Sequence, residues 1–329
     1  MKLAKRHKFA QLSGFVNGVL RNIARNIDSV QFDTLSIQYS MPQWIVDRFV
    51  AAYGEKKAEE IFKAFHSKST ISIRTNRTRC TPDELRVMLE AEGVTVTAVD
   101  ELNYAFVISG FDYLNGLQSF RDGLFYVQDI SSMLVAQTAA PKKGDYVIDV
   151  CAAPGGKSTH IAELLQGSGH VLARDLTDNK VDMIEENIER HGLNNMSAEV
   201  WDATVFDADS AGKADILVCD LPCSGLGVLG RKKDIRYKMT PESVDELAAL
   251  QRQILDTVHT YVKPNGVLVY STCTIDEAEN EDNVRWFIEK HPEFELDKSF
   301  AEGTGMKQIL PGEHGSDGFF IARFIKSKL

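Results

Sequence analysis

The alternation of strand and helix patterns after about residue 129 is the feature that most constrains how this chain can fold. Short apolar runs, typical of buried strands, alternate with longer runs whose apolar residues recur three or four positions apart, as on one face of a helix. This alternation predicts an α/β fold with a mostly parallel sheet that helices cover on both faces. The predicted strands are residues 146–150, 170–174, 198–201, 216–219, 267–270 and 319–324, and the predicted helices are residues 158–165, 178–191, 241–261 and 279–290.

The chain before this region divides into two further parts. Residues 1–27 have the apolar spacing of one amphipathic helix, which cannot form a core by itself. Residues 36–125 mix helix and strand patterns, and Thr81-Pro82 has the cap and the first-turn residue of a helix start. We therefore expect a helical segment at 1–27, a smaller α+β domain at 28–125 and a large α/β domain at 126–329, with helices near 42–53 and 56–65 and a strand at 70–75 in the smaller domain.

Composition excludes several classes of protein. The 329 residues include five scattered cysteines, an odd number that does not form a disulfide framework, so a reducing compartment is expected. No apolar run approaches the ~18 residues of a membrane helix. The basic N-terminus lacks the continuous apolar segment and the cleavage site of a signal peptide. We therefore expect a cytoplasmic protein with no membrane partner.

The distribution of charge favours a nucleic-acid partner more than the total charge does. The formal net charge of -10 argues weakly against such a partner. Basic residues nevertheless gather in three short segments, and such clusters can bind phosphates even in an acidic protein. Each cluster alone could equally be solvated surface. The clusters are Lys2, Lys5, Arg6, Lys8, Arg21 and Arg25; Lys68, Arg74, Arg77 and Arg79; and Arg231, Lys232, Lys233, Arg236 and Lys238.

A glycine-rich turn, residues 151–157 (CAAPGGK), follows the first strand of the large domain. It does not match the phosphate-binding loop of nucleotide hydrolases, because Cys151 stands where that motif needs a glycine. The dinucleotide fingerprint fails as well, since the two glycines are adjacent. Glycines at a strand-to-helix turn let the backbone approach a ligand closely, and the start of the helix favours a carboxylate or phosphate.

Two acids follow the next two strands, where nucleotide-type ligands are commonly held. Asp175 ends the second strand, at the place where an acid typically binds ribose hydroxyls, and Asp202 follows the third strand, where it could border an adenine. A ligand with a ribose, a base and a carboxylate fits this arrangement, and S-adenosylmethionine is such a ligand. The alternative is a structural turn with surface acids.

Two cysteines stand directly after predicted strands. Cys223 lies in the run 220–225 (DLPCSG) and Cys273 in the run 271–274 (STCT), 50 residues apart. The strand ends of an open α/β sheet converge on one crevice, so two thiols there suggest covalent chemistry on a substrate. Basic side chains and a cofactor sulfonium beside them would lower the pKa of both thiols. The other three cysteines, Cys80, Cys151 and Cys219, are expected to be small buried apolar residues.

Together these motifs resemble a known family. The runs 151–157 (CAAPGGK), 220–227 (DLPCSGLG) and 270–274 (YSTCT) are similar to runs of the RNA cytosine-5 methyltransferases of the nucleolar-protein/Sun (Fmu) family, and 126–132 (YVQDISS) and 317–320 (DGFF) fit the same family. The resemblance covers roughly residues 1–326. It implies a Rossmann-like S-adenosylmethionine-dependent methyltransferase sheet with an antiparallel final strand, preceded by a smaller RNA-binding domain. It also implies that residues 1–27 are the last helices of an all-helical domain that this chain mostly lacks.

The resemblance assigns roles to the candidate site residues. It implies that Cys273 is the nucleophile that adds to C6 of a cytosine, and that Cys223 acts in product release or in removal of the C5 proton. It implies that Asp220 contacts N3 and the exocyclic amine of the base, and that Lys157 serves both cofactor and active site. The implied substrate is RNA, with small-subunit ribosomal RNA favoured. The cofactor residues would be Cys151, Ala152, Ala153, Pro154, Gly155, Gly156, Lys157, Asp175, Asp202 and Asp220.

Three alternative functions stay open from the sequence. Transfer RNA is the substrate of related enzymes with the same motifs. A P-loop-like nucleotide hydrolase would use Lys157 and Ser158 on phosphates, but it leaves both thiol motifs unexplained. A non-catalytic RNA-binding protein could keep the fold, although folding does not demand Cys223, Cys273 and Asp220 together.

Two smaller points concern the surroundings of the thiols. No Cys-x-x-Cys pair occurs, and Cys219 and Cys223 have no histidine pair nearby, so no metal is predicted. The run 279–281 (ENE) resembles a family run after the nucleophile, and helix capping explains it almost as well. The sequence does not predict an oligomeric state.

Overall fold

The computed structural model describes residues 2–29, 31–67 and 70–328. Two compact units, residues 1–48 and 49–329, make up the chain, and helix α4 (Gln43–Tyr53) contains the boundary between them. This division differs from the domain limits expected after residues 27 and 125, which stay predictions. Lys68, a member of one predicted basic cluster, lies outside the described residues. Within the described ranges, every helix is too short or too polar to cross a membrane.

The first unit is helical. The single helix predicted over residues 1–27 is interrupted, because Lys8 adopts a left-handed backbone with a φ of 66°. Most apolar side chains of the helix at Ser13–Asn26 are exposed, and the side chain of Phe15 is 72% exposed. The apolar spacing therefore predicted the helix but not its break. The elements are α1 (Lys2–Arg6), η1 (Ala10–Leu12), α2 (Ser13–Asn26), η2 (Ile27–Ser29) and α3 (Leu35–Gln38).

The second unit contains a four-stranded antiparallel sheet with the strand order β2-β3-β1-β4. The predicted helix start at Thr81 is confirmed. Its hydroxyl accepts a hydrogen bond from the Glu84 N–H, and the Glu84 carboxylate accepts one from the Thr81 N–H, a reciprocal capping box. The elements of this part are α5 (Glu55–His66), β1 (Ile71–Thr75), α6 (Pro82–Ala91), β2 (Thr95–Ala98), β3 (Ala105–Ser109), η3 (Leu114–Gly116), α7 (Gln118–Arg121) and β4 (Phe125–Val127).

The large sheet has the strand order β10-β12-β9-β8-β5-β6-β7, with β11 paired to β12. Strands β7, β6, β5, β8 and β9 run parallel, and β12 is antiparallel to β9, as the resemblance implied. The strands are β5 (Tyr146–Asp149), β6 (His170–Asp175), β7 (Met196–Val200), β8 (Ala214–Asp220), β9 (Val262–Thr272), β10 (Phe294–Leu296), β11 (Met306–Ile309) and β12 (Phe319–Lys326).

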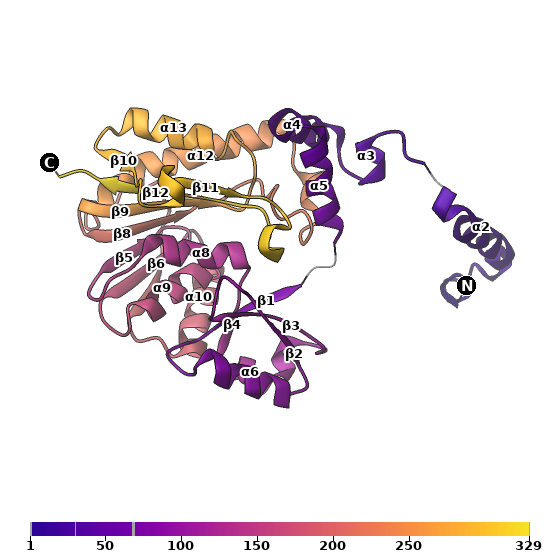
Figure 1. The fold of residues 1–329 in the computed structure, drawn as a ribbon, viewed down its shortest axis with the longest axis horizontal. Coiled ribbons are helices and arrows are strands. Elements are labelled where there is room, and N and C mark those ends of the chain that lie inside the picture. Colours follow the sequence, from indigo (N-terminus) through magenta and orange to yellow (C-terminus); the bar gives the residue numbers. More distant parts are fainter. Residues whose placement is uncertain (1, 30, 68–69, 329) are drawn as a thin grey trace. The chain divides into compact units, whose positions relative to one another are not determined.

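Helices cover both faces of the large sheet, as predicted. Leu217 belongs to the core with α12 and α13, whereas the next residue, Val218, belongs to the core with α8 and α9. Consecutive strand residues point to opposite faces, so each central strand contributes to both cores. Figure 1 shows α12 and α13 on one side of the sheet and α8, α9 and α10 on the other. The helices are α8 (Ile130–Ala139), α9 (Gly156–Leu164), α10 (Asp178–His191), α11 (Ile235–Lys238), α12 (Pro241–Val258), η4 (His259–Tyr261) and α13 (Glu281–Lys290), and two short turns are η5 (Ala301–Gly303) and η6 (Glu313–Gly315).

The strand order reverses beside β5. Strands β6 and β7 lie on one side of it, and β8 and β9 lie on the other. Ligands of open α/β sheets bind at the carboxyl ends of the strands beside such a switch point. The last residues of β5, β6, β8 and β9 are Asp149, Asp175, Asp220 and Thr272. Four converging strand ends therefore carry the candidate site.

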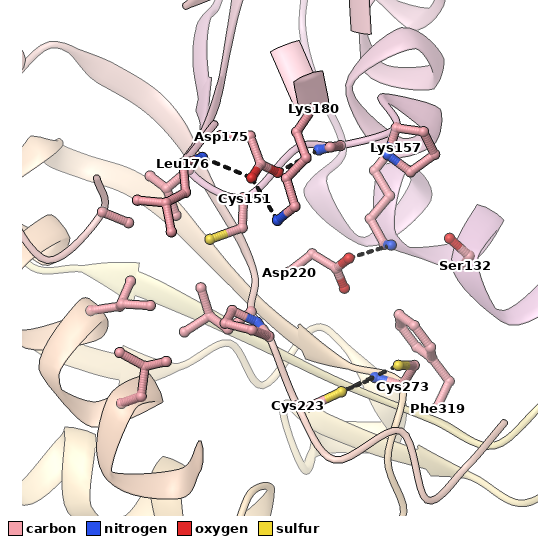
Figure 2. A pocket seen from close by; sticks show the side chains of 18 of the residues that line it. Ser132, Cys151, Lys157, Asp175, Leu176, Lys180, Asp220, Cys223, Cys273 and Phe319 are labelled. Carbon is pink, nitrogen blue, oxygen red and sulfur yellow. Dashed lines mark hydrogen bonds and ion pairs between the residues drawn. The ribbon is translucent and has the colours of Figure 1, made fainter. Parts of the chain in front are cut away.

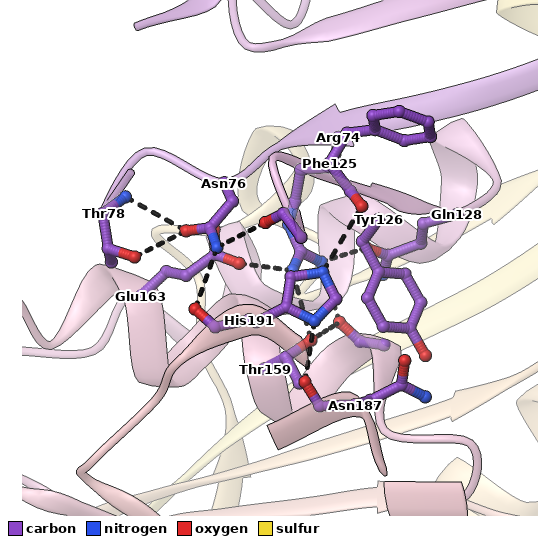
Figure 3. Close-up of polar contacts among 12 residues, drawn as sticks. Arg74, Asn76, Thr78, Phe125, Tyr126, Gln128, Thr159, Glu163, Asn187 and His191 are labelled. Carbon is purple, nitrogen blue, oxygen red and sulfur yellow. Dashed lines mark hydrogen bonds and ion pairs between the residues drawn. The ribbon is translucent and has the colours of Figure 1, made fainter. Parts of the chain in front are cut away.

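A buried arginine joins the small sheet to the large domain (Figure 3). Arg74 on β1 is 1% exposed, and its guanidinium pairs with the Glu163 carboxylate of α9 at 2.7 Å. The guanidinium also donates to the carbonyl oxygen of Gly156 at 2.8 Å, to the hydroxyl of Thr159 at 3.1 Å and to the side chain of Gln128. The small sheet is thereby fixed to the helix that follows the glycine turn.

Replacing Arg74 by alanine is expected to destabilise residues 49–329 strongly, because the buried Glu163 carboxyl loses its partner. Breaking a buried ion pair from one side costs about 3–5 kcal/mol of unfolding free energy. Urea unfolding followed by circular dichroism measures this loss. Arg86→Ala is the matched control, since Arg86 is exposed and pairs with Glu90 one helical turn away, a contribution of about 0.3–0.5 kcal/mol. Equal losses for the two variants would contradict the structural role of Arg74.

Candidate active site

A pocket of about 560 Å³ lies at the carboxyl ends of β5, β6, β8 and β9. Figure 2 shows side chains from all four strand ends pointing into it. Most of the predicted site residues line this pocket, whereas Ala152, Gly155 and Gly156 of the glycine turn do not. The predicted residues that line it are Cys151, Ala153, Pro154, Lys157, Asp175, Asp202, Asp220, Cys223 and Cys273.

Other lining residues were not predicted as site residues. Asp129, Asp317 and Phe319 belong to runs that supported the family resemblance, so the sequence did carry a signal for them. Trp201 also lines the pocket. Lys180, Leu250 and Ile254 come from the surfaces of α10 and α12, and no local motif marks them.

A buried acid, Asp149, is hydrogen-bonded to the glycine turn and to the first turn of α9. Asp149 accepts a hydrogen bond from the Ser158 hydroxyl at 2.5 Å and one from the Cys151 N–H at 3.4 Å. Burial raises the pKa of Asp149 to about 7. Gly155, with a φ of 102°, directly precedes α9 in a left-handed conformation that a glycine adopts without strain. Asp149 was not predicted as a site residue. Its position as an acid at the end of the first strand of the large domain could have marked it.

The two acids predicted for a nucleotide-type ligand both line the pocket. Asp175 is buried, and its carboxylate accepts a hydrogen bond from the Ala153 N–H at 2.9 Å and one from the Lys180 ammonium at 2.8 Å. The end of β6 is thus bonded directly to the glycine turn. Asp202 is exposed, and its carboxylate accepts hydrogen bonds from the N–H and the hydroxyl of Thr204 at 2.9 and 2.7 Å.

A lysine–aspartate pair lies between the glycine turn and the thiols (Figure 2). The Lys157 ammonium donates to one carboxylate oxygen of Asp220 at 2.6 Å, and the Ser271 hydroxyl donates to the other at 2.8 Å. The ammonium also lies 5.4 Å from the centroid of the Phe319 ring. Burial acts to lower the pKa of Lys157, but the Asp220 carboxylate outweighs burial and the pKa is raised. Lys157 is therefore a cation at neutral pH.

The two candidate thiols are in contact. The sulfur atoms of Cys223 and Cys273 lie 3.2 Å apart, and the Cys273 N–H donates to the Cys223 sulfur at 3.3 Å. Parallel pairing of β8 with β9 brings together two loops that are 50 residues apart in sequence. Both side chains are half-buried at the pocket wall, within reach of a substrate.

The environment separates the pKa values of the two thiols. The hydrogen bond between the sulfurs lowers the pKa of Cys273, against the effects of burial and of the Asp220 carboxylate, and the Lys157 ammonium contributes to the lowering. The same hydrogen bond raises the pKa of Cys223, and burial and the nearby Glu279 carboxylate add to this. Cys273 is therefore the thiol that ionises more readily. The prediction that both thiols have a lowered pKa is wrong for Cys223, whose pKa is raised by its contact with Cys273 and by burial.

Two glycines let the loop of the first thiol pass close to the C-terminal loop. A Cβ on Gly227 would lie 2.3 Å from the carbonyl oxygen of Gly318 and 2.8 Å from that of Cys273. The Gly227 N–H donates to the Cys273 carbonyl at 3.1 Å, and the Gly318 N–H donates to the Gly227 carbonyl at 2.9 Å. This close approach explains why both runs contain a glycine at these positions.

The predicted basic clusters are only partly available to a ligand. Arg74 and Arg236 are buried, and Arg231 pairs with Asp129 at 3.0 Å and with Asp317 at 2.5 Å. Burial raises the pKa of Asp317 to about 6. Arg79 donates to the carbonyl oxygens of His191 and Asp122, and Lys238 pairs with Asp234 at 2.7 Å. Several residues of the clusters are therefore held by partners within the protein.

One cluster of metal-type ligands occurs among the described residues. Asp256, His259 and His291 have ligand atoms within 4.8 Å of one another. The cluster lies at the C-terminal end of α12 and includes none of the residues that line the pocket. The Asp256 carboxylate there pairs with the Lys290 ammonium at 2.9 Å and lies 3.2 Å from His291. This acid already has a cationic partner.

Two family models match the chain. Residues 136–325, which include the glycine turn and both thiols, match the model described as 16S rRNA methyltransferase RsmB/F. Residues 41–111 match the model described as a Methyltr_RsmF/B-like, ferredoxin-like domain. The first match alone covers more than half of the chain.

Individual proteins agree with this family. The chain is 37% identical to the probable ribosomal RNA small subunit methyltransferase B of Bacillus subtilis, over 99% of this chain and 76% of that protein. It is 33% identical to the ribosomal RNA small subunit methyltransferase B of Salmonella paratyphi A, over 97% of this chain and 74% of that protein.

Solved structures agree as well. The crystal structure of PH0851 has a TM-score of 0.84 at 29% identity and covers 99% of this chain and 75% of its own. The structure of NSun6 from Pyrococcus horikoshii with SFG has a TM-score of 0.79 at 25% identity, and the match covers 88% of this chain and 99% of that chain. The chain therefore belongs to the 16S rRNA methyltransferase RsmB/F family and is an S-adenosylmethionine-dependent RNA methyltransferase.

Proposed function

We propose that this protein transfers a methyl group from S-adenosylmethionine to C5 of a cytosine in RNA, with small-subunit ribosomal RNA as the substrate. The observation that carries the proposal is the contact between Cys223 and Cys273, 3.2 Å apart, beside the Lys157–Asp220 pair. Cytosine C5 is too weak a nucleophile to accept a methyl group unaided, and addition of a thiolate at C6 overcomes this. Relatives named ribosomal RNA small subunit methyltransferase B support the choice of RNA.

The pocket suits S-adenosylmethionine in its volume and in its polar groups. We assign Asp175 to the ribose hydroxyls, Asp202 to the border of the adenine, and the turn 151–157 with the start of α9 to the carboxylate. The apolar side chains of Leu250 and Ile254 face the same space and suit the adenine ring. Asp220 completes the predicted cofactor set. When bound, the cofactor supplies an activated methyl group.

We assign the role of nucleophile to Cys273. Its thiolate adds to C6, so a sulfur–carbon bond forms and electron density moves to C5, which becomes able to accept a methyl group. The C5 proton then passes to a base, the C5–C6 double bond reforms, and the sulfur–carbon bond breaks to return the thiolate. We assign Cys223 to this release step, because it is the group in contact with the Cys273 sulfur.

Asp220 and Lys157 support the addition step. Addition of the thiolate at C6 moves negative charge onto N3 of the cytosine, and a proton delivered to N3 by the Asp220 carboxyl, at the end of β8, neutralises it; the resulting carboxylate then accepts hydrogen bonds from N3–H and from the exocyclic amine. Lys157 fixes this carboxylate at 2.6 Å and adds positive charge that favours the Cys273 thiolate. The two side chains therefore act on the base and on the nucleophile together.

RNA binding is assigned to the smaller α+β domain expected at residues 28–125 and to the rim of the pocket. Arg77 is exposed after β1, and Lys232 lines the pocket beside the thiols. Both can contact phosphates, although the Arg77 guanidinium also lies 5.1 Å from the centroid of the buried Tyr104 ring. The pocket lies within the protein surface, so the target cytosine has to leave its stack or come from a single-stranded loop.

The direct test uses tritiated S-adenosylmethionine, protein-free small-subunit ribosomal RNA and mapping of any 5-methylcytosine. Label at one cytosine supports both the reaction and the substrate. If the protein binds the cofactor but transfers no methyl group to this RNA, the proposed substrate is wrong. If it does not bind the cofactor, the proposed reaction is wrong. Small-subunit RNA isolated from cells that lack the gene provides an unmodified target.

Replacing Cys273 by alanine is expected to lower methyl transfer by about 10⁴-fold or more, because the adduct at C6 cannot form. Cofactor binding, measured by calorimetry, should persist. Cys80→Ala is the matched control, since this thiol is buried in the core of the small sheet, and it should keep its turnover. Turnover by Cys273→Ala would exclude Cys273 as the nucleophile.

Replacing Cys223 by alanine is expected to trap the enzyme on its substrate, because the adduct still forms while its release is blocked. Denaturing gels with labelled RNA and cofactor should show a protein–RNA band that the wild type lacks. The double variant Cys223→Ala, Cys273→Ala should show no such band. Absence of the band from the single variant, with Cys273 still reactive toward a thiol reagent, would remove Cys223 from the release step.

A further inference from the structure

A buried carboxylate holds the loop of the first thiol. Glu279 is 0% exposed, and its carboxylate accepts hydrogen bonds from the N–H of Ser224 at 2.9 Å and from the Ser224 hydroxyl. It also accepts one from the side-chain amide of Gln251 at 2.9 Å, and the same amide donates to the Pro222 carbonyl at 2.9 Å. The residues on both sides of Cys223 are therefore tied to Glu279, one directly and the other through Gln251.

The next residue holds the loop of the second thiol. The side-chain oxygen of Asn280 accepts a hydrogen bond from the Thr272 hydroxyl at 2.5 Å, and its amide donates to the Thr274 carbonyl at 3.1 Å. Thr272 and Thr274 flank Cys273. The same amide donates to the Gln308 side chain at 2.9 Å, which ties this loop to β11. Asn280 is also 0% exposed.

Neither side chain is explained by helix capping, the alternative from the sequence. Asn280 stands at the cap position of α13, yet its side chain makes no capping hydrogen bond with the described residues of that helix. Its polar atoms point to the thiol loop instead. Because Glu279 and Asn280 are consecutive, their Cα atoms are ~3.8 Å apart and cannot separate. Two consecutive residues are thus hydrogen-bonded to the two thiol loops, and this limits how far the loops can move apart.

We propose that Glu279 and Asn280 are positioning residues that clamp the loops of Cys223 and Cys273, so that the two sulfur atoms stay in contact. Neither residue touches the reacting atoms. A fully satisfied buried polar network of this kind is rigid, because each lost hydrogen bond would leave a buried polar group unpaired. The catalytic consequence rests on the proposed methyl transfer, whereas the geometry of the thiols does not.

The clamp also has an electrostatic side. The Glu279 carboxylate lies near Cys223, while the Lys157 ammonium lies near Cys273. The Glu279 carboxylate raises the pKa of Cys223, whereas at Cys273 the Asp220 carboxylate raises the pKa and the Lys157 ammonium lowers it. A cavity in place of the carboxylate would loosen the loop, and it would also remove one cause of the raised pKa of Cys223.

The first measurement compares Glu279→Ala, Glu279→Gln and Glu277→Ala in methyl transfer. Glu279→Ala is expected to lower kcat about 10²-fold, the scale of a 1 Å misplacement of catalytic groups, with KM for RNA and Kd for the cofactor unchanged. Glu279→Gln should restore most of kcat, since its amide oxygen still accepts from Ser224 and Gln251. Glu277→Ala is the control, because Glu277 is exposed and pairs with the exposed Arg285, and it should match the wild type.

The second measurement needs neither RNA nor cofactor, so failure of the proposed function leaves it intact. Each protein is treated with iodoacetamide, and the labelled peptides are quantified by mass spectrometry. The wild type and Glu277→Ala should be alkylated faster at Cys273 than at Cys223, because the contact between the thiols lowers the pKa of Cys273 and raises that of Cys223. Glu279→Ala should lose this selectivity, and Glu279→Gln should retain more of it.

Three results would overturn the clamp: Glu279→Ala with the kcat and the thiol selectivity of the wild type, a loss of kcat that only follows the unfolded fraction seen by circular dichroism, or a Glu279→Gln as impaired as the alanine variant. If Glu279→Ala does not fold, Ser224→Ala replaces it, since this change removes the hydrogen bonds of the Ser224 hydroxyl to Glu279 and to Thr274 and leaves the carboxylate. Ser224→Ala is expected to lower both kcat and selectivity. Wild-type behaviour of that variant would likewise overturn the proposal.

Discussion

Parallel pairing of β5 with β8 and of β8 with β9 brings Asp149, Asp220 and Thr272 to one edge of the large sheet. The register places Asp220 opposite Ser271, which lets the Ser271 hydroxyl bond the carboxylate that Lys157 also holds. A slip of one residue would turn each of these side chains to the other face of the sheet. The contact between the two thiols depends on the same register, because each cysteine stands a fixed number of residues beyond its strand. The close passage of the loops at Gly227 and Gly318 is a further consequence of that pairing.

Two chemically identical side chains acquire different properties in this frame. The contact between the sulfurs and the nearby Lys157 ammonium lower the pKa of Cys273, whereas the same contact, burial and the Glu279 carboxylate raise the pKa of Cys223. Neighbouring groups whose environments push their pKa values apart are typical of acid–base division in active sites. The division here needs no difference in residue type. It follows from which loop each thiol occupies and from what the sheet and α12 place behind that loop.

The sequence predicted the large domain well, because its strands are apolar runs and its helices are amphipathic, and both patterns are local. It also predicted the residues at the strand ends, since in a parallel sheet the end of each strand lies on the same edge. Strands such as β4 and β10, with three residues each, are too short to form a pattern. Lys180 and Ile254 were missed because the side of a helix that faces a pocket depends on its packing. The opposite pKa shifts of the thiols were missed for the same reason, since only the folded loop brings the Glu279 carboxylate near Cys223 and the two sulfurs into contact.

Arg74 bonds the carbonyl oxygen of Gly156, the residue that precedes Lys157, and at the same time neutralises Glu163 on α9. Protein engineers redirect multidomain enzymes by exchanging a recognition domain for another at the chain boundary. In this protein such a graft cannot be treated as a modular swap, since the small sheet supplies a cation on which the interior of the catalytic domain relies. A donor domain would have to carry an arginine at the position of Arg74, with Gln128 retained beside it, or the acceptor would need an apolar residue in place of Glu163. The small domain is, in this sense, part of the scaffold of the methyltransferase.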